Sequence, residues 1–148
     1  MDMDYECLEP IESILSEGEL FLGLEPQENA MINRKDAIVG NALMASVPHH
    51  PFMKCVIDNI KKNGCKSIPN KSLQIMETTG PFMLTRMYEE FPDKDEITLL
   101  PAELVAPLCI SEVQDLLQGK TNEEMERKVE RAYAIHYFGS SWHSQITE

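Results

Sequence analysis

A short apolar run at residues 20–24, with the sequence LFLGL, constrains the fold of this chain most strongly. Gly18 allows a turn just before the run, and five consecutive residues suit a strand better than a helix. We therefore expect a buried β-strand here. Glu25 follows at the end of this strand, where its carboxylate could either contact a bound molecule or cap the loop.

Two segments predict helices that begin with a proline in the first turn. Residues 51–64 show an apolar rhythm at i, i+3 and i+4 and close with two lysines and a glycine, and residues 81–91 end before Pro92. The Thr121 to Glu124 spacing resembles a capping box and predicts a charged, solvent-facing helix to about Tyr133. Residues 37–47 could form a strand followed by helical turns. The other expected elements are short helices at 11–15 and 111–117 and strands at 1–5, 97–100 and 134–138.

Length, charge and cysteine content limit the class of protein. A chain of 148 residues with 43% hydrophobic content is sized for a single domain spanning 1–148. The net charge of −12 opposes binding to nucleic acid. We also expect no membrane span, no secretion signal and reduced cysteines, which together favour a cytoplasmic protein, either free or peripheral to a membrane.

Two groups of residues could carry chemistry. Asp2 and Asp4 share one face if residues 1–5 form a strand, and paired carboxylates are ligands that Mg²⁺ and Mn²⁺ prefer. Such pairs are common, and most are solvated charge. Near the other end, His136 could supply a neutral ring nitrogen, while Ser141 and Trp142 could donate hydrogen bonds to phosphate. Ordinary structural roles also fit these residues: His136 as a hydrogen-bonded core histidine and Trp142 as a packed hydrophobic side chain.

Taken together, the motifs resemble glycosyltransferase family 32. The run MDMDYECLEPIESIL is similar to the segment that follows GGIY in that family, and the likeness continues in order through LFLGLEP, NALMASVPHHPF, TGPFMLT and the ending AYAIHYFGSSW. The resemblance implies a mixed α/β fold of the GT-A kind, in which a sheet is flanked by helices. It also implies a metal-dependent transfer of a hexose from a nucleoside-diphosphate sugar to a glycan hydroxyl, with retention of configuration.

The resemblance also implies roles for individual residues. Asp2, Asp4 and His136 match the ligands of a Mn²⁺ or Mg²⁺ ion. Ser141 and Trp142 match positions expected to contact the diphosphate. Four further residues match segments that wall the donor sugar or acceptor cleft: Asn41, Thr79, Gly80 and Pro81. His49 and His50 could contact acceptor hydroxyls or simply form a helix entry.

One departure from the family pattern leaves two functions open. The half that holds the nucleotide base should precede the DxD motif, and here that motif is at residues 2–4. The chain could be a transferase, or a catalytically incomplete remnant that binds glycan or a partner chain. In the second case, the exposed edge of the amino-terminal strand would favour self-association or the binding of a partner chain.

Overall fold

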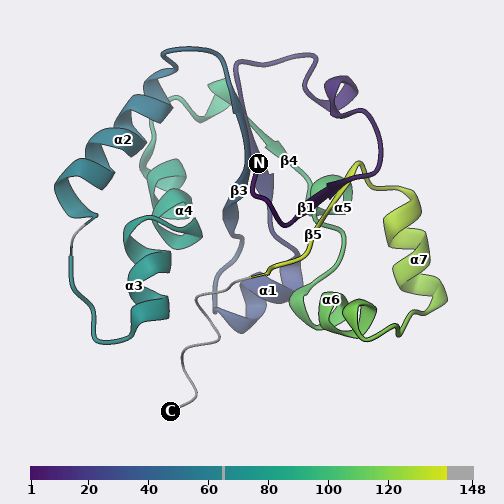
Figure 1. The fold of residues 1–148 in the computed structure, drawn as a ribbon. Coiled ribbons are helices and arrows are strands. Elements are labelled where there is room, and N and C mark those ends of the chain that lie inside the picture. The colour runs from purple at the N-terminus through teal and green to yellow at the C-terminus, as the bar shows by residue number, and fades with distance from the viewer. Residues whose placement is uncertain (65, 140–148) are drawn as a thin grey trace.

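The computed structural model describes residues 1–64 and 66–139. At its centre lies a three-stranded sheet in the order β3-β2-β4 (Figure 1). Strand β2 (Leu20–Leu24) pairs antiparallel with β3 (Val39–Ser46) and parallel with β4 (Ile97–Leu100), so the sheet is mixed. The predicted mixed α/β class is confirmed.

A second, two-stranded sheet joins the two ends of the described chain. Strand β1 (Tyr5–Cys7) pairs antiparallel with β5 (Ala134–His136), and Tyr5 lies opposite His136. This pairing brings the amino-terminal residues beside residues more than a hundred positions away in the sequence, as Figure 1 shows.

Three helices cover one face of the central sheet: α2 (Pro51–Asn63), α3 (Lys71–Thr78) and α4 (Pro81–Glu90) (Figure 1). Because side chains alternate along a strand, Leu20 and Leu22 point to this face and pack in one cluster with Phe52 and Leu84. The Thr85 hydroxyl accepts a hydrogen bond from the Val39 amide at 2.9 Å, which ties α4 to β3.

Different elements cover the opposite face. Phe21, between the two leucines, packs there with Leu43, Leu100 and Val105. Val105 belongs to α5 (Ala102–Val105), and the 3₁₀ turn η1 (Ile11–Ile14) adds partly buried apolar side chains.

The remaining helices lie beside β5 and below the sheet: α1 (Gln27–Ile32), α6 (Ile110–Leu117) and α7 (Glu123–Glu130), with a 3₁₀ turn η2 (Lys94–Glu96) before β4 (Figure 1). Leu108, Val113 and Met125 form the core between α6 and α7. None of the helices in the described ranges combines the length and apolarity needed to cross a membrane.

The strands at 20–24 and 97–100 and the helices starting at Pro51 and Pro81 are confirmed, and residues 39–46 form one continuous strand without helical turns. The expected strand at 1–5 is wrong, because β1 begins only at Tyr5, and Met3 and Asp4 form a turn. The cap of α7 is Asn122 rather than Thr121, since the Asn122 side chain accepts from the Glu124 and Met125 amides.

Candidate functional site

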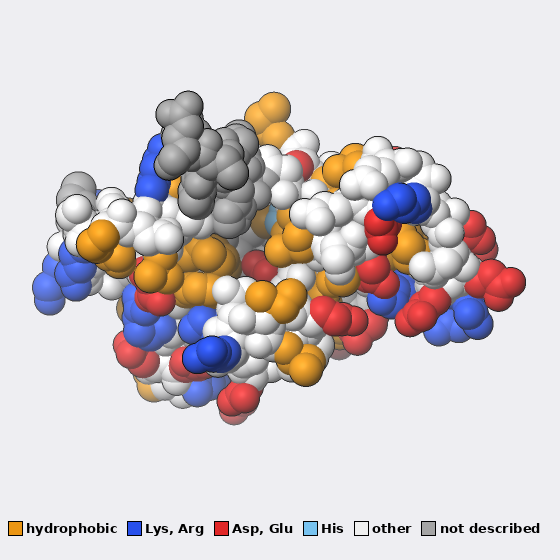
Figure 2. Space-filling model, turned by 90° about the horizontal axis from the view of Figure 1, so that it is seen from below, with side chains coloured by type: hydrophobic (Ala, Val, Ile, Leu, Met, Phe, Trp, Pro, Cys, Tyr) orange, Lys and Arg blue, Asp and Glu red, His pale blue; other side chains and the backbone are white. Residues whose placement is uncertain are grey.

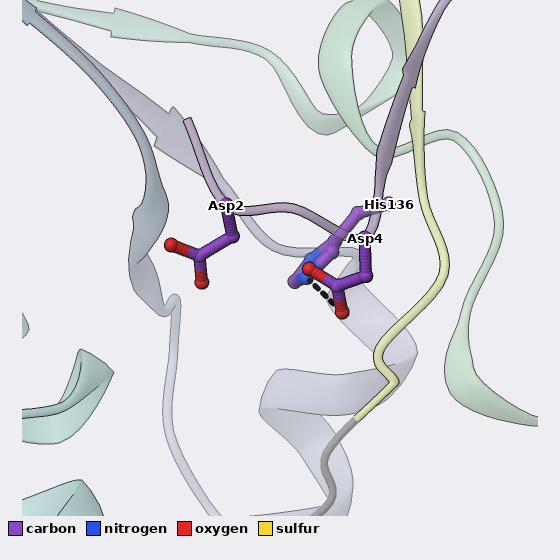
Figure 3. A group of neighbouring side chains, drawn as sticks. All are labelled: Asp2, Asp4 and His136. Carbon is purple, nitrogen blue, oxygen red and sulfur yellow. Dashed lines mark ion pairs between the residues drawn. The ribbon is translucent and has the colours of Figure 1, made fainter.

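Asp2, Asp4 and His136 come together in space (Figure 3). One potential ligand atom from each of the three lies within 4.8 Å of the others. The Asp4 Oδ2 atom lies 3.4 Å from the His136 Nε2 atom. The structure therefore assembles the three residues that the sequence grouped as metal ligands.

Backbone hydrogen bonds hold the two aspartates in place. The Tyr137 amide donates to the Asp4 carbonyl at 2.9 Å, which extends the β1–β5 ladder past Tyr5. The Gly139 amide donates to Asp4 Oδ2 at 2.7 Å. The Asp2 amide donates to the Ala42 carbonyl on β3 at 2.7 Å, so the turn between the aspartates bridges the two sheets.

His136 is buried between two aromatic rings. Tyr5 stacks on it with ring centroids 4.5 Å apart, and Phe138 lies 4.1 Å away at a tilt. Burial lowers the pKa of His136 below its ordinary value, and this effect outweighs the opposing charges of Asp4 and Asp2. The imidazole is therefore neutral near pH 7, which is the form that binds a metal.

The three residues line a cleft of about 640 Å³. Figure 2 looks into this hollow, where acidic atoms lie behind a rim of hydrophobic side chains. The other lining residues come mainly from β3, α3, α4 and α6 and from the segment after β5: Met3, Glu25, Asn41, Ala42, Ile75, Met76, Gly80, Pro81, Ile110, Gln114, Phe138 and Gly139.

The electrostatics of the cleft fit a cation. Within residues 1–64 and 66–139, no lysine or arginine lines it, so the carboxylates of Asp2 and Asp4 face the cleft without a basic side chain. Oxygen ligands with one imidazole suit Mn²⁺ well and Mg²⁺ acceptably. The donor set is therefore compatible with the divalent ion expected from the sequence.

The cleft-wall predictions have different outcomes. Asn41, Gly80 and Pro81 line the same cleft as Asp2, Asp4 and His136. Thr79 is exposed outside this lining, because it ends α3 and its hydroxyl turns back to the Ile75 carbonyl at 3.4 Å. Ser141 and Trp142 lie outside the described residues.

The adjacent residues His49 and His50 have different surroundings. His50 is buried and caps α2, since its Nδ1 atom accepts from the Phe52 amide at 3.2 Å. His49 adopts a positive φ of 65° in the preceding turn. Both lie outside the cleft lining, which leaves the helix-entry interpretation.

Sequence reasoning did not identify several residues that line the cleft or support it. Tyr5 directly follows the aspartates, but only the β1–β5 register reveals its contact with His136. Ile75 and Met76 belong to α3, a helix that the sequence analysis did not predict. For Glu25, the sequence left open whether the carboxylate contacts a bound molecule or caps the loop. Its side chain lines the cleft, and burial raises its pKa to about 7, although a hydrogen bond from Asn29 acts in the opposite direction.

Comparison with known proteins gives one informative relative. The chain is 30% identical over 145 residues to inositol phosphoceramide mannosyltransferase 2 of Schizosaccharomyces pombe (strain 972 / ATCC 24843). The alignment covers 97% of this chain and 35% of the fungal protein, so the chain spans about a third of that relative's length. No protein-family profile matches the sequence, and no solved structure matches it. The chain is thus related to a fungal mannosyltransferase, and this similarity supports a glycosyltransferase relationship.

Proposed function

We propose that this chain carries the metal and diphosphate side of a family 32 glycosyltransferase, which moves a hexose from a nucleoside-diphosphate sugar to an acceptor hydroxyl. The observation that supports the proposal most strongly is the convergence of Asp2, Asp4 and His136 at one cleft from opposite ends of the sequence. Similarity to the fungal mannosyltransferase supports the same class of reaction.

In this proposal Asp2, Asp4 and neutral His136 hold a Mn²⁺ or Mg²⁺ ion. When bound, the ion supplies positive charge that neutralises the departing diphosphate. Ser141 and Trp142 donate hydrogen bonds to the same group. The acceptor oxygen forms a bond to the anomeric carbon as the bond from that carbon to the diphosphate oxygen breaks. The acceptor proton passes to the leaving phosphate, and the anomeric configuration is retained.

The fungal relative guides the choice of substrates. Its name describes transfer of mannose to inositol phosphoceramide. We therefore propose mannose as the first hexose to test, and a molecule carrying an inositol or mannose hydroxyl as the first acceptor.

A hydrolysis assay tests the proposal directly. The protein is incubated with GDP-mannose or UDP-sugars and Mn²⁺, and release of the nucleoside diphosphate is measured. We expect slow release that EDTA abolishes and that Asp4→Asn reduces by roughly a hundredfold. Asp58→Asn is the matched control, because Asp58 is an exposed aspartate on α2 that pairs with the exposed Lys54 and lies outside the cleft lining.

Two results would contradict the proposal in different ways. Hydrolysis that survives both EDTA and Asp4→Asn would place the chemistry elsewhere. Metal binding without any release would overturn transfer by this chain alone and favour a module that only binds glycan.

A further inference from the structure

Glu25 occupies a second position in the cleft, on a different element from the candidate metal ligands. It directly follows the central strand β2, and its amide donates to the Ile38 carbonyl at 3.0 Å. Pro26 comes next and begins the turn into α1. The backbone on both sides is thus fixed, and the side chain lines the cleft.

A buried amide orients the Glu25 carboxyl group. Asn29 is only 1% exposed, and its Oδ1 atom accepts a hydrogen bond from the Ile110 amide at 3.2 Å. Because this oxygen is committed to a backbone N–H, the Nδ2 group must be the end that faces Glu25. It donates to Glu25 Oε2 at 3.4 Å.

The other carboxyl oxygen of Glu25 stays available. Among the described residues, Oε1 accepts no hydrogen bond, and no lysine or arginine forms an ion pair with Glu25. A Cβ atom placed on Gly40 would lie 3.5 Å from Glu25 Cγ and 4.0 Å from Oε1. The glycine therefore leaves the space beside this carboxyl group open.

The surroundings indicate the kind of molecule that Oε1 would meet. Ile75, Met76 and Phe138 give the cleft apolar walls. A sugar or cyclitol ring offers a C–H face for such walls and hydroxyl donors for a carboxylate oxygen. Phosphate fits poorly at Glu25, because an ionised Glu25 carboxylate repels it directly, whereas the charges of Asp2 and Asp4 would be offset by the cation of the proposed function.

We propose that Glu25 binds a ring hydroxyl of the acceptor through Oε1, and that Asn29 is its positioning residue. This assignment rests on the proposed function for calling the ring an acceptor. The binding itself is independent of turnover and is measured without a donor.

The test is a titration of ¹⁵N-labelled protein with myo-inositol and with methyl α-mannoside, followed by amide chemical shifts in the presence of Mg²⁺. We expect saturable shifts at Glu25, Asn29 and Ile75, and binding about fivefold weaker in Glu25→Gln. Glu28→Gln removes the same charge three residues away and leaves binding unchanged, because Glu28 lines a separate cleft.

The pH dependence separates Glu25 from its neighbours. An ionised carboxylate accepts a stronger hydrogen bond than a neutral acid, so binding should strengthen as pH rises through about 7, where Glu25 titrates. Asp2, Asp4 and His136 also line the cleft, and Tyr5 stacks on His136; Glu25→Gln retains all four. A pH dependence that persists in Glu25→Gln, equal binding by that variant, or no shift with either ligand would overturn the proposal.

The role of Asn29 has its own measurement. The Asn29 hydrogen bond lowers the pKa of Glu25, so Asn29→Ala should move the Glu25 carboxyl titration, followed by ¹³C NMR, to higher pH. An unchanged titration in a folded variant would remove Asn29 from the proposal. If GDP-mannose hydrolysis persists while both ring ligands fail to bind, only the role of Glu25 is refuted. If the ring ligands bind but GDP-mannose is not hydrolysed, the transferase assignment is refuted.

Discussion

The Tyr5 ring lies flat against the His136 imidazole, with ring centroids 4.5 Å apart and planes inclined by only 10°. Burial, together with the charges of Glu25, Asp4 and Asp2, raises the pKa of the Tyr5 hydroxyl well above its usual range. The hydroxyl therefore keeps its proton and lies within the field of both groups of carboxylates.

Replacement of Tyr5 should affect metal binding through His136. The ring fixes the imidazole plane, and loss of an orienting neighbour typically weakens metal binding by 10- to 100-fold, roughly. We expect Tyr5→Ala to weaken Mn²⁺ binding by about tenfold. Tyr5→Phe keeps the stacked ring, so its affinity for Mn²⁺ should stay within about twofold of the wild-type affinity. Calorimetric titration with Mn²⁺ measures both, and equal losses in the two variants would assign the effect to the hydroxyl instead.

Glu25 should make stability depend on pH in an unusual direction. Its pKa is raised to about 7 in the folded protein, against roughly 4.3 in an unfolded chain. Between these values the folded state binds more protons than the unfolded state, so this group's contribution to stability falls as pH rises through that window. Above about pH 7, Glu25 no longer contributes this free energy of unfolding.

Urea unfolding of the wild type and Glu25→Gln at pH 5 and pH 8 measures this effect. The stability difference in favour of Glu25→Gln should grow by about 2–3 kcal/mol from pH 5 to pH 8. His136, whose lowered pKa acts in the opposite sense, is present in both proteins and cancels in the comparison. Parallel pH profiles would show that Glu25 titrates normally.

Glu112 links two helices and should matter for stability. Its Oε2 atom accepts from the Cys109 amide at 2.9 Å, which caps α6, and its Oε1 atom accepts from Lys128 on α7 at 2.6 Å. Glu112→Ala removes both contacts and should lower the free energy of unfolding by about 1–2 kcal/mol. Asp58→Ala breaks a fully exposed pair with Lys54 and should leave the free energy of unfolding nearly unchanged. Thermal and urea unfolding compare the two, and similar small losses would show that the Glu112 contacts contribute little.

The elements that the sequence predicted are those with strong local signals. The run at 20–24 and the helices after Pro51 and Pro81 have clear periodicity and clear boundaries. Helix α3 was missed because its eight residues mix polar and apolar types, although Asn70 does cap it through the Leu73 amide. The strand expected at 1–5 failed because alternation over five residues also fits a turn.

The candidate site was only partly accessible from the sequence. The pairing of β1 with β5 decides which residues face Asp2 and Asp4, and no spacing rule predicts a contact across 130 positions. The prediction that Asp2, Asp4 and His136 act together came from similarity to a known family. The position of Glu25 depends on the end of β2, on Asn29 and on the open space at Gly40, which are tertiary features.

Titration of the protein with Mn²⁺ tests the central claim most directly. We expect one ion per chain, with paramagnetic broadening of the Asp2, Asp4 and His136 NMR signals, and binding weakened at least about tenfold in Asp4→Asn but unchanged in Asp58→Asn. Broadening confined to other acidic residues, or equal affinity in Asp4→Asn and the wild type, would contradict a metal site at Asp2, Asp4 and His136.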